Sequence, residues 1–294
     1  MKILVFGAGG QVGSEVRRAA WPSRYVVRPL DRKAVDITKD AAVAEVLRRE
    51  RPDLVINLAA YTAVDRAESE PEAAWATNCA GAAHLAAACD ETAASLVHLS
   101  TDYVFNGRKA RPYQEEDAVD PLGVYGRSKE AGERAVRAAL ARHVILRTAW
   151  VFGASGANFV KTMLRLAGER RVLRVVADQR GCPTAAADIA AALIAISGSV
   201  ERGEAKWGTF HFASDAPISW HGFAEAIFAL AGPRLASHPN VEPIATDQYP
   251  TLAQRPMNSV LDCRRIEEAF GISRPHWPAS LAAVIAELLD RPPP

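Results

Sequence analysis

The chain has 294 residues, of which 49% are hydrophobic and 23% are charged, with 35 basic residues against 34 acidic ones. This composition is typical of a globular protein and argues against disorder, collagen-like repeats and coiled coils. Because the net charge is only +1 and the Lys and Arg residues are scattered, nothing in the charge pattern indicates a nucleic acid or a membrane surface as a partner.

The cysteines and the N-terminus predict a cytoplasmic protein. Cys79, Cys89, Cys182 and Cys263 lie far apart without a Cys-x-x-Cys pair, which argues against a zinc site or a disulfide framework and favours a reducing compartment. The first seven residues lack the basic region, apolar segment and cleavage site of a signal peptide. No apolar run reaches the roughly 18 residues that a membrane-spanning helix needs.

Up to Trp150 the chain alternates short apolar runs with longer Ala-rich segments. The runs predict strands that are buried on both faces, as in a parallel sheet. These strands are expected at residues 3–6, 25–30, 54–58, 96–99 and 144–146. Helices are expected at residues 12–20, 40–50, 72–89 and 128–142, with Pro71 just inside the start of the third. The alternation predicts an α/β fold with a Rossmann-type, doubly wound parallel sheet.

After Trp150 the pattern becomes less regular, which predicts a smaller, discontinuous C-terminal domain for the substrate. Helices are expected at residues 159–169, 188–197, 223–230 and 279–289, and strands at 172–176 and 209–212. Recurrent prolines predict irregular loops around a cleft at 232–257, and the Pro-rich tail at 291–294 is expected to fray. Residues 1–155, with 187–215 returning to them, are expected to form the dinucleotide-binding domain. Residues 156–186 and 216–294 are expected to form the substrate domain.

The glycine-rich segment GAGGQVG at residues 7–13 follows the first predicted strand and opens the first predicted helix. In such a turn Gly7 can make the tight bend, Gly10 lets the backbone approach a pyrophosphate, and Gly13 allows the helix to pack closely on the strand. The N–H groups and the dipole of the helix N-terminus then bind the anion. A glycine-rich turn without a ligand is the alternative, but the order of strand, turn and helix favours dinucleotide binding.

Two charged residues at the end of the second strand leave the choice of cofactor open. Asp31 has the position at which an acid binds the adenosine ribose hydroxyls, whereas Arg32 can pair with a 2′-phosphate. The glycines are also spaced three and three, unlike the two and three of the commonest dehydrogenase motif. We expect NADPH to be preferred and NADH to be accepted as well.

Tyr125 and Lys129 are four residues apart and therefore share one face of a helix. A cation near a phenol favours the phenolate, which brings the pKa of the tyrosine toward the range useful for proton transfer. Alone, this spacing fits an exposed Tyr and Lys equally well. Residues 100–102, Ser-Thr-Asp, follow a strand predicted to end at Leu99 and so reach the carboxyl edge of the sheet, where doubly wound folds bind ligands. A hydroxyl at this edge can share a substrate carbonyl oxygen with Tyr125.

With these residues the sequence resembles the extended short-chain dehydrogenase/reductases and, within them, the dTDP-4-dehydrorhamnose reductases. The similarity runs nearly end to end and is carried by long, specific segments. These segments are GAGGQVG (7–13), RPDLVINLAAYTAVDRAESEPE (51–72), STDYVFNG (100–107), PLGVYGRSKEAGE (121–133), RTAWVFG (147–153), NFVKTMLRLA (158–167), DQRGCPT (178–184) and RPMNSVLD (255–262).

The resemblance implies a role for each matching residue of the reaction centre and the cofactor site. Tyr125 is implied as the proton donor, Thr101 as its partner on the ketone oxygen, and Lys129 as the residue that binds the nicotinamide ribose. The implied cofactor-binding residues are Gly7, Gly10, Gln11, Val12, Gly13, Asp31, Arg32, Asp36, Ile37, Ala59, Ala60, Tyr61, Tyr125 and Lys129.

The resemblance also implies a dTDP-sugar as the substrate. Asp102 and Trp150 are expected to contact the sugar, and Arg255 the diphosphate, a role suited to a planar bidentate guanidinium. The implied substrate-binding residues are Thr62, Val64, Thr101, Asp102, Tyr125, Trp150 and Arg255. Without the resemblance, Trp150 would be interpreted as a core aromatic at a strand end and Arg255 as a solvated loop charge.

The expected reaction is the reduction of the C4 ketone of dTDP-4-dehydro-L-rhamnose, with hydride from NADPH or NADH and a proton from Tyr125. One alternative is an epimerase or dehydratase of another nucleotide-sugar, although a dehydratase would need a second carboxylate directly after Asp102. The other alternative is a non-catalytic, cofactor-binding regulatory subunit of the same fold. The intact set of Thr101, Tyr125 and Lys129 argues against this regulator.

Some members of the family dimerise around a magnesium ion held by glutamates. Glu15, expected in the first turn of the first helix, matches one of these positions, but Ala187 occupies the second, with Asp188 one place later. Magnesium prefers several oxygen ligands in near-octahedral geometry. The sequence therefore argues against a metal-bridged dimer and predicts a monomer or a homodimer that does not depend on metal.

Overall fold

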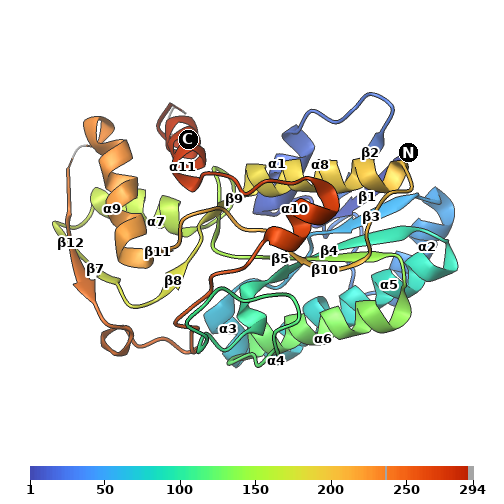
Figure 1. Cartoon of the computed structure of the whole chain (residues 1–294), viewed down its shortest axis with the longest axis horizontal. Helices are drawn as coiled ribbons and strands as arrows, with labels where there is room; N and C mark the ends of the chain where they lie inside the picture. The colour runs from blue at the N-terminus through green and yellow to red at the C-terminus, as the bar shows by residue number, and fades with distance from the viewer. Residues whose placement is uncertain (236, 291–294) are drawn as a thin grey trace.

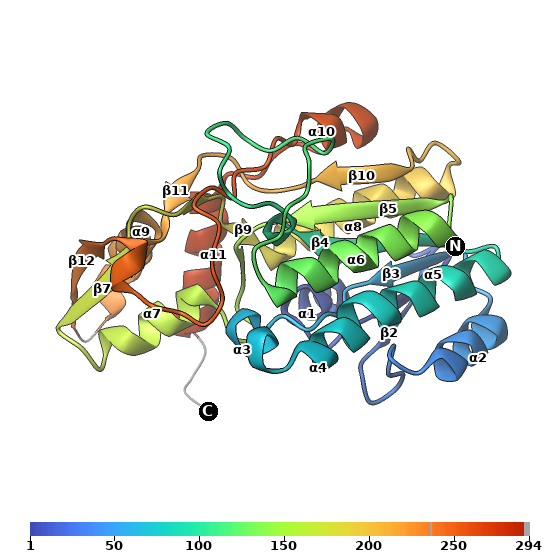
Figure 2. The same ribbon diagram turned by 90° about the horizontal axis from the view of Figure 1, so that it is seen from below.

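The computed structural model describes residues 1–235 and 237–290, so the fraying expected for residues 291–294 lies outside the described residues. The larger part of the molecule is a six-stranded, all-parallel sheet with helices on both faces, as predicted (Figures 1 and 2). Its strand order is β2-β1-β3-β4-β5-β10. The strands are β1 (Lys2–Phe6), β2 (Val26–Leu30), β3 (Leu54–Asn57), β4 (Ser95–Thr101), β5 (His143–Thr148) and β10 (Gly208–His211).

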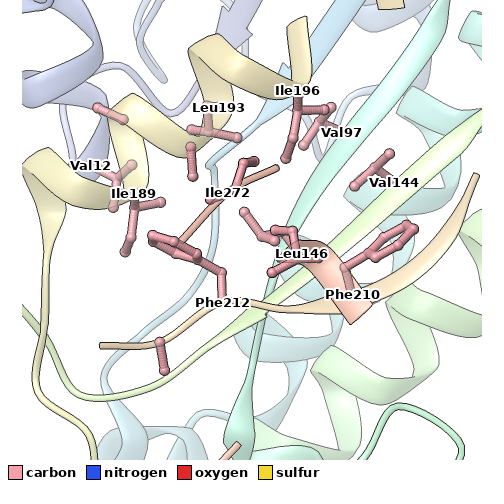
Figure 3. Close-up of a cluster of buried hydrophobic side chains, with 14 of the residues drawn as sticks. Val12, Val97, Val144, Leu146, Ile189, Leu193, Ile196, Phe210, Phe212 and Ile272 are labelled. Atoms are coloured by element: carbon pink, nitrogen blue, oxygen red, sulfur yellow. The ribbon is translucent and has the colours of Figure 1, made fainter. Parts of the chain in front are cut away.

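Strands β1, β3, β4 and β5 are buried on both faces, which is why they appear in the sequence as continuous apolar runs, whereas the edge strand β2 is mostly exposed. Helices α1 (Gln11–Arg18) and α8 (Ala186–Glu201) cover one face, and α2 (Asp40–Glu50), α5 (Gly81–Glu91) and α6 (Val124–Ala139) cover the other (Figures 1 and 2). On β1, Ile3 and Val5 belong to one apolar core, whereas Leu4 and Phe6 belong to the other. Figure 3 shows the first core, in which side chains of α1 and α8 meet those of β4, β5 and β10.

The helix expected at residues 72–89 is not regular along its length. Helix α4 (Pro71–Trp75), with Pro71 in its first turn as predicted, joins α5 through a π-helical turn, η1 (Ala76–Ala80). In this turn the side chain of Asn78 accepts a hydrogen bond from the N–H of Tyr61 at 2.8 Å and donates to the carbonyl of Tyr61 at 3.1 Å and to Oγ of Ser128 at 3.0 Å. The π-turn therefore ties the loop after β3 to α6. Such turns recur at functional sites, but no local pattern in the sequence predicts this one.

Two predicted boundaries shift near the carboxyl edge of the sheet. Helix α6 begins at Val124 instead of Ser128, with Gly123 as its N-cap, so Tyr125 lies in its first turn. Strand β4 continues to Thr101 instead of ending at Leu99, because its pairing with β5 extends to that residue. Thr101 is therefore the last residue of a strand and not part of the loop.

A smaller lobe lies beyond the carboxyl edge of the sheet, at the left in Figure 1. Its own apolar core joins α7 (Phe159–Ala167), α9 (Trp220–Ala231) and α11 (Trp277–Asp290) to a parallel pair of strands, β7 (Val172–Val176) and β12 (Asn240–Ile244). Strand β12 shows that the expectation of irregular loops throughout residues 232–257 is wrong. It contains Pro243, which a strand with a neighbour on one side tolerates. The same segment also holds two helical turns, η3 (Gly232–Arg234) and η4 (Thr246–Gln248).

Short helices and strands without a predicted counterpart complete the fold. Two are the helices α3 (Val64–Ser69) and α10 (Arg264–Phe270). The others are two short strand pairs, β6 (Val151–Phe152) with β9 (Thr184–Ala185) and β8 (Arg180–Gly181) with β11 (Ile218–Ser219). Ile266 and Ile272, in and just after α10, are buried in the core under α8, although the sequence assigns residues 216–294 to the substrate domain. Over the described ranges, no helix is both long enough and apolar enough to cross a membrane.

Candidate active site

The loops after β1 and β3 meet where the strand order of the sheet reverses. Gly7 has a φ of +80°, and a Cβ on it would lie 2.4 Å from the backbone N of Ala59. A Cβ on Gly13 would lie 2.4 Å from the carbonyl oxygen of Gly7, so Gly13 packs α1 against the turn itself and not against the strand. Glycine is required at both positions. In doubly wound sheets this reversal point is where ligands bind.

The N-terminus of α1 opens toward the same place. Gly10 is its N-cap, and a Cβ on Gly10 would meet no atom closer than the carbonyl oxygen of Gly7, at 3.4 Å. The first turn of α1 holds no acidic residue that would repel an anion. Since the free N–H groups of a helix N-terminus bind phosphate, the turn fits the diphosphate of a dinucleotide.

A cavity of about 380 Å³ lies beside this turn. Its lining includes Gly7, Gly10, Asp31, Arg32, Asp36, Ile37, Ala59, Ala60 and Tyr61, all of which the sequence predicted as cofactor residues. Asp31 accepts a hydrogen bond from the N–H of Ala34 at 2.9 Å. Arg32, with its side chain 81% exposed, pairs with Asp36 at 3.3 Å. An exposed pair of this kind is weak, so Arg32 is available to a phosphate in the cavity.

A second cavity of about 860 Å³ continues from the first, past Gly10 and Ala60, along the carboxyl edge of the sheet. Thr101 at the end of β4 and Tyr125 and Lys129 on α6 line it, and all three side chains are buried. The other predicted residues on its wall are Gln11, Val12, Gly13, Thr62, Val64, Asp102, Trp150 and Arg255. Among the predicted site residues, Glu15 is the one that lines neither cavity.

The phenol of Tyr125 is protonated at neutral pH. Burial raises its pKa to about 12, the hydroxyl of Thr101 lowers it by less, and the charge of Asp102 adds to the increase. The lowering expected from Lys129 is not found among the causes of this shift; in this structure Nζ of Lys129 donates to the carbonyl oxygen of Leu99 at 2.7 Å. Tyr125 is therefore built to act as an acid.

Lys129 is among the largest fully buried side chains of the protein. Besides its bond to Leu99, its Nζ lies 3.4 Å from Nε2 of His98. Burial lowers the pKa of the Lys129 ammonium to about 8, although the charge of Glu133 opposes this shift. This lysine can therefore exchange a proton near neutral pH as well as bind a ligand.

A buried carboxylate holds the strand and the helix of the site together. Glu133 accepts hydrogen bonds from Oγ of Ser100 at 2.6 Å and from Nε and Nη2 of Arg147 at 2.9 and 2.7 Å. Burial by itself would raise the pKa of Glu133, but the hydrogen bonds and charge of Arg147 hold it below its usual value. Ser100 adjoins Thr101, and Glu133 lies one turn after Lys129, so this ion pair fixes the relative positions of the reacting groups. The sequence reasoning missed Glu133 and Arg147, although both lie in segments that carry the resemblance.

Asp102 presents an unsatisfied oxygen in the buried part of the site. Its Oδ1 accepts a hydrogen bond from Thr101 at 3.0 Å, whereas its Oδ2 is buried without a hydrogen-bond partner among the described residues. Burial raises the pKa of Asp102 to about 6. Because a buried carboxylate oxygen needs a donor, Asp102 is suited to bind a hydroxyl group of a ligand.

Trp150 is both packed and part of the cavity wall. It has a φ of +49°, which is uncommon for a large side chain, and its ring stacks on Trp220 with centroids 3.5 Å apart and planes 6° apart. Gly181 lies so close that a Cβ on it would be 2.4 Å from Cε2 of Trp150. Phe159 extends the aromatic surface against Trp220, with centroids 4.7 Å apart. Trp150 is thus packed against aromatic neighbours and also faces the second cavity, and its contact with a sugar stays a prediction.

Arg255 is held in place by a carboxylate and is not a free loop charge. Its two terminal nitrogens donate to the two oxygens of Asp65 at 3.1 and 2.7 Å, and these bonds lower the pKa of Asp65. Arg255 lines the second cavity and also a third, of about 840 Å³, in the smaller lobe. The guanidinium therefore lies at the junction between the reaction centre and the smaller lobe.

The third cavity is lined mostly by residues that the sequence reasoning missed. Gln179, Arg174 and Gln248 give it polar groups, and Met163 and Leu166 give it an apolar wall. Met163, Leu166 and Gln179 lie in segments that carry the resemblance, whereas Arg174 and Gln248 lie in none. These side chains come from separate elements, so no local spacing in the sequence marks them as one site.

Glu15 lies in the second turn of α1 and not in the first, as the sequence predicted. It pairs with Arg18, which also contacts Glu287 of α11 at 2.5 Å. Asp188 accepts a hydrogen bond from Oγ of Ser280 at 2.7 Å. In residues 1–235 and 237–290, no group of three or more His, Cys, Asp or Glu side chains is arranged to hold a metal ion.

A doubly wound sheet with a phosphate-binding turn at its reversal point, and with Thr101, Tyr125 and Lys129 beside that turn, defines an oxidoreductase of the short-chain dehydrogenase/reductase class. The particular family follows from comparison with known proteins. The chain belongs to the family described as the RmlD substrate binding domain, whose model matches residues 1–290.

Relatives named as dTDP-4-dehydrorhamnose reductases match the chain over nearly its whole length. The dTDP-4-dehydrorhamnose reductase of Aggregatibacter actinomycetemcomitans is 45% identical over 289 residues, which are 97% of this chain and 98% of the relative. The solved dTDP-4-dehydrorhamnose reductase of Clostridium acetobutylicum has a TM-score of 0.92 at 38% identity, covering 98% of this chain and 99% of its own. The same enzyme from Bacillus anthracis, solved in complex with NADP, has a TM-score of 0.90 at 36% identity, covering 97% of this chain and 99% of its own.

Proposed function

We propose that this protein is a dTDP-4-dehydrorhamnose reductase, which reduces the C4 ketone of dTDP-4-dehydro-L-rhamnose to give dTDP-L-rhamnose. The observation that carries the proposal is the buried set of Thr101, Tyr125 and Lys129 in a cavity that extends from the phosphate-binding turn to the smaller lobe. The names of the relatives support the choice of substrate within this class.

The residues of the chain divide the reaction between them. A bound NADPH supplies the hydride. Tyr125, whose pKa burial raises further above neutral, to about 12, is protonated and donates its proton to the ketone oxygen as that oxygen gains charge. The hydroxyl of Thr101, which donates to Asp102 in this structure, turns to donate its hydrogen bond to the same oxygen, and Lys129 binds the nicotinamide ribose.

The substrate-binding roles follow the position of each group. Oδ2 of Asp102 accepts a hydrogen bond from a sugar hydroxyl, and Trp150 packs against the sugar, with Thr62 and Val64 on the same wall. Arg255 binds the diphosphate, and the third cavity accepts the nucleoside. These assignments extend the reaction centre into the smaller lobe.

The cofactor site accepts both nicotinamide cofactors and prefers NADPH. The NADP complex of the Bacillus anthracis relative and the exposed guanidinium of Arg32 support this preference. In our proposal residues 1–155 and 187–215 bind the cofactor, and residues 156–186 and 216–294 bind the substrate, with α10 and its flanks as a structural extension of the sheet core. The enzyme acts in the cytoplasm as a monomer or as a homodimer independent of metal.

A direct assay distinguishes this function from its alternatives. The purified protein is mixed with NADPH and either dTDP-4-dehydro-L-rhamnose or a UDP-linked 4-ketosugar, and NADPH oxidation and the product are followed by absorbance and NMR. A reductase oxidises NADPH and forms dTDP-L-rhamnose. Stereochemical exchange without net oxidation would indicate an epimerase, and cofactor binding without turnover of any ketosugar would indicate a regulatory subunit.

A further inference from the structure

His98 adjoins Lys129 in the interior of the protein and has no part in the mechanism above. It lies on β4, is 1% exposed, and has its Nε2 at 3.4 Å from Nζ of Lys129. Its other ring nitrogen, Nδ1, lies 2.9 Å from Nδ2 of Asn57, the last residue of β3, which is also 1% exposed. Asn57, His98 and Lys129 therefore form a buried chain of contacts that ends at the reaction centre.

The hydrogen bonds of Asn57 decide which nitrogen of His98 carries the hydrogen. Oδ1 of Asn57 accepts a hydrogen bond from the backbone N–H of Ala59 at 3.0 Å. Because a backbone N–H can only donate, the amide group of Asn57 is fixed with Nδ2 toward His98. Nδ2 can only donate as well, so Nδ1 of His98 accepts. The imidazole is therefore neutral and carries its hydrogen on Nε2, facing Lys129.

A donor on Nε2 affects the charge of Lys129. A neutral amine offers its lone pair to the Nε2–H group, whereas an ammonium offers only hydrogens. The carbonyl oxygen of Leu99 accepts one hydrogen from Nζ in either state, at 2.7 Å. The contact with His98 therefore favours the neutral amine, in the same direction as the burial that lowers the pKa of Lys129 to about 8.

The other titratable groups around this pair have their own partners. Glu133 on α6 opposes the lowered pKa of Lys129, but its carboxylate is bound by Arg147 of β5. Tyr125, one turn before Lys129, is neutral below its raised pKa. His143 of β5 faces His98 and is hydrogen-bonded to a backbone carbonyl, and burial lowers its pKa.

We propose that Asn57 and His98 are positioning residues that favour the neutral form of Lys129 and so make its ammonium a better proton donor to Tyr125. The inference rests on the proposed function. After Tyr125 has given its proton to the ketone oxygen, the phenolate takes up one proton from the ammonium of Lys129, and the neutral amine that remains accepts a hydrogen bond from Nε2–H of His98. A free proton from the solvent, the one that the reduction consumes overall, then restores the ammonium.

The proposal is tested by the titration of Lys129 in the full-length protein. Lysine labelled with ¹³C at Cε is followed by NMR as a function of pH, and the Lys129 signal is assigned with the Lys129→Arg variant. The wild-type midpoint is expected at about 8. In His98→Gln the side-chain amide can turn its oxygen toward the ammonium, which raises the midpoint by on the order of one pH unit.

A second variant and a matched control isolate the role of the tautomer. Asn57→Leu removes the donor to Nδ1 of His98 without adding a charge, so the ring can carry its hydrogen on Nδ1 and turn Nε2 into an acceptor, which also raises the Lys129 midpoint. His143→Gln removes a buried histidine from the neighbouring strand, but this residue has no hydrogen bond to Lys129 among the described contacts, so the midpoint should not move. An unchanged midpoint in folded His98→Gln or Asn57→Leu overturns the proposal, as does an equal shift in His143→Gln. If His98→Gln does not fold, Asn57→Leu decides.

The same variants have a kinetic signature in the holoenzyme. Because the ammonium returns a proton to Tyr125 after the chemical step, kcat for the ketosugar should fall as the pH rises through the pKa of Lys129. A raised pKa therefore moves this alkaline limb to higher pH in His98→Gln, whereas a structural defect would lower kcat at every pH and leave the limb in place, which would contradict the proposal. The NMR titration uses no substrate, so a shifted midpoint in a protein that does not turn over dTDP-4-dehydro-L-rhamnose would retain the inference about His98 and reject the proposed function.

Discussion

The cofactor side and the substrate side of the central cavity are built in different ways. On the cofactor side the backbone forms the site. A Cβ on Gly7 would lie 2.4 Å from the backbone N of Ala59, and a Cβ on Gly13 would lie 2.4 Å from the carbonyl oxygen of Gly7, so only glycine lets these backbone segments approach one another. On the substrate side, side chains from distant segments form the site, as in the stack of Trp150 on Trp220. A site formed by backbone tolerates no side chain at its glycine positions. The shape of a site formed by side chains depends instead on how two parts of the molecule pack against each other.

The reacting groups lie between these two sides and share properties of both. Thr101, Tyr125 and Lys129 come from regular elements of the sheet layer, yet the buried ion pair of Glu133 and Arg147 is needed to fix them relative to one another. Mutation of the proton donor should therefore change the chemical step without changing the binding of the cofactor or of the sugar nucleotide.

The largest effect is expected from removing the proton donor. Tyr125→Phe should lower kcat by 10²–10⁴-fold, the range typical of a lost general acid, while leaving the affinity for NADPH nearly unchanged. Lys129→Met should weaken both kcat and NADPH binding, because the ammonium serves both. Stopped-flow NADPH oxidation and fluorescence titration measure the two quantities, and near-wild-type turnover in Tyr125→Phe would refute the mechanism.

A pair of glycine substitutions separates the two sides directly. Gly7→Ala places a Cβ against the backbone of Ala59 and should weaken NADPH binding by about 100-fold. Gly181→Ala places a Cβ against Trp150 and should lower kcat/KM for the sugar nucleotide by about the same factor, with NADPH affinity retained.

Two further glycines provide the controls for this pair. Gly203 has a φ of +71° with no atom within 4 Å of a Cβ, so Gly203→Ala should cost about 1 kcal/mol of stability and leave binding unchanged. Gly168→Ala meets an ordinary contact at 3.6 Å and should change neither affinity. If each of Gly7→Ala and Gly181→Ala lowered the affinity for NADPH and kcat/KM for the sugar nucleotide by the same factor, the two sides would not be independent.

A smaller effect is expected from the exposed charge at the adenosine cavity. Arg32→Ala should lower the ratio of kcat/KM for NADPH to that for NADH by about 10-fold or less, because an exposed ion pair contributes little free energy. Arg48, an exposed arginine of α2 that pairs with Glu91, is the matched control, and Arg48→Ala should leave the ratio unchanged. A ratio that is identical in the Arg32 variant and the wild type would show that another group recognises the 2′-phosphate.

The smallest effect is expected from chelation, which should change neither activity nor oligomeric state. Glu15 pairs with Arg18, and Ala187 occupies the position at which some relatives are expected to have a second acid. Light scattering with and without EDTA, with the NADPH assay in parallel, measures both properties. Dissociation of a dimer together with loss of activity on chelation would show that another carboxylate, such as Asp188, completes a metal site.

The sequence by itself determined the sheet, most of its helices and the glycine turn after β1. Strands buried on both faces must be continuous apolar runs, and a turn that excludes any Cβ must contain glycine, so both features are visible within a few residues. The spacing of Tyr125 and Lys129 likewise follows from the geometry of one helix. The boundaries next to the site were less well predicted: β4 ends where its pairing with β5 stops, and α6 begins at Val124, after the N-cap Gly123.

Only the tertiary structure decided the substrate side and the electrostatics of the reaction centre. The contacts of Trp150 with Trp220, of Arg255 with Asp65 and of Arg147 with Glu133 join residues that no local period relates. Strand β12 was missed for the same reason, because its partner β7 lies far back along the chain. Burial, which a sequence shows only on average, raises the pKa of Tyr125 and lowers that of Lys129, and these opposite shifts make Lys129 the group of the two that gives up its proton first as the pH rises.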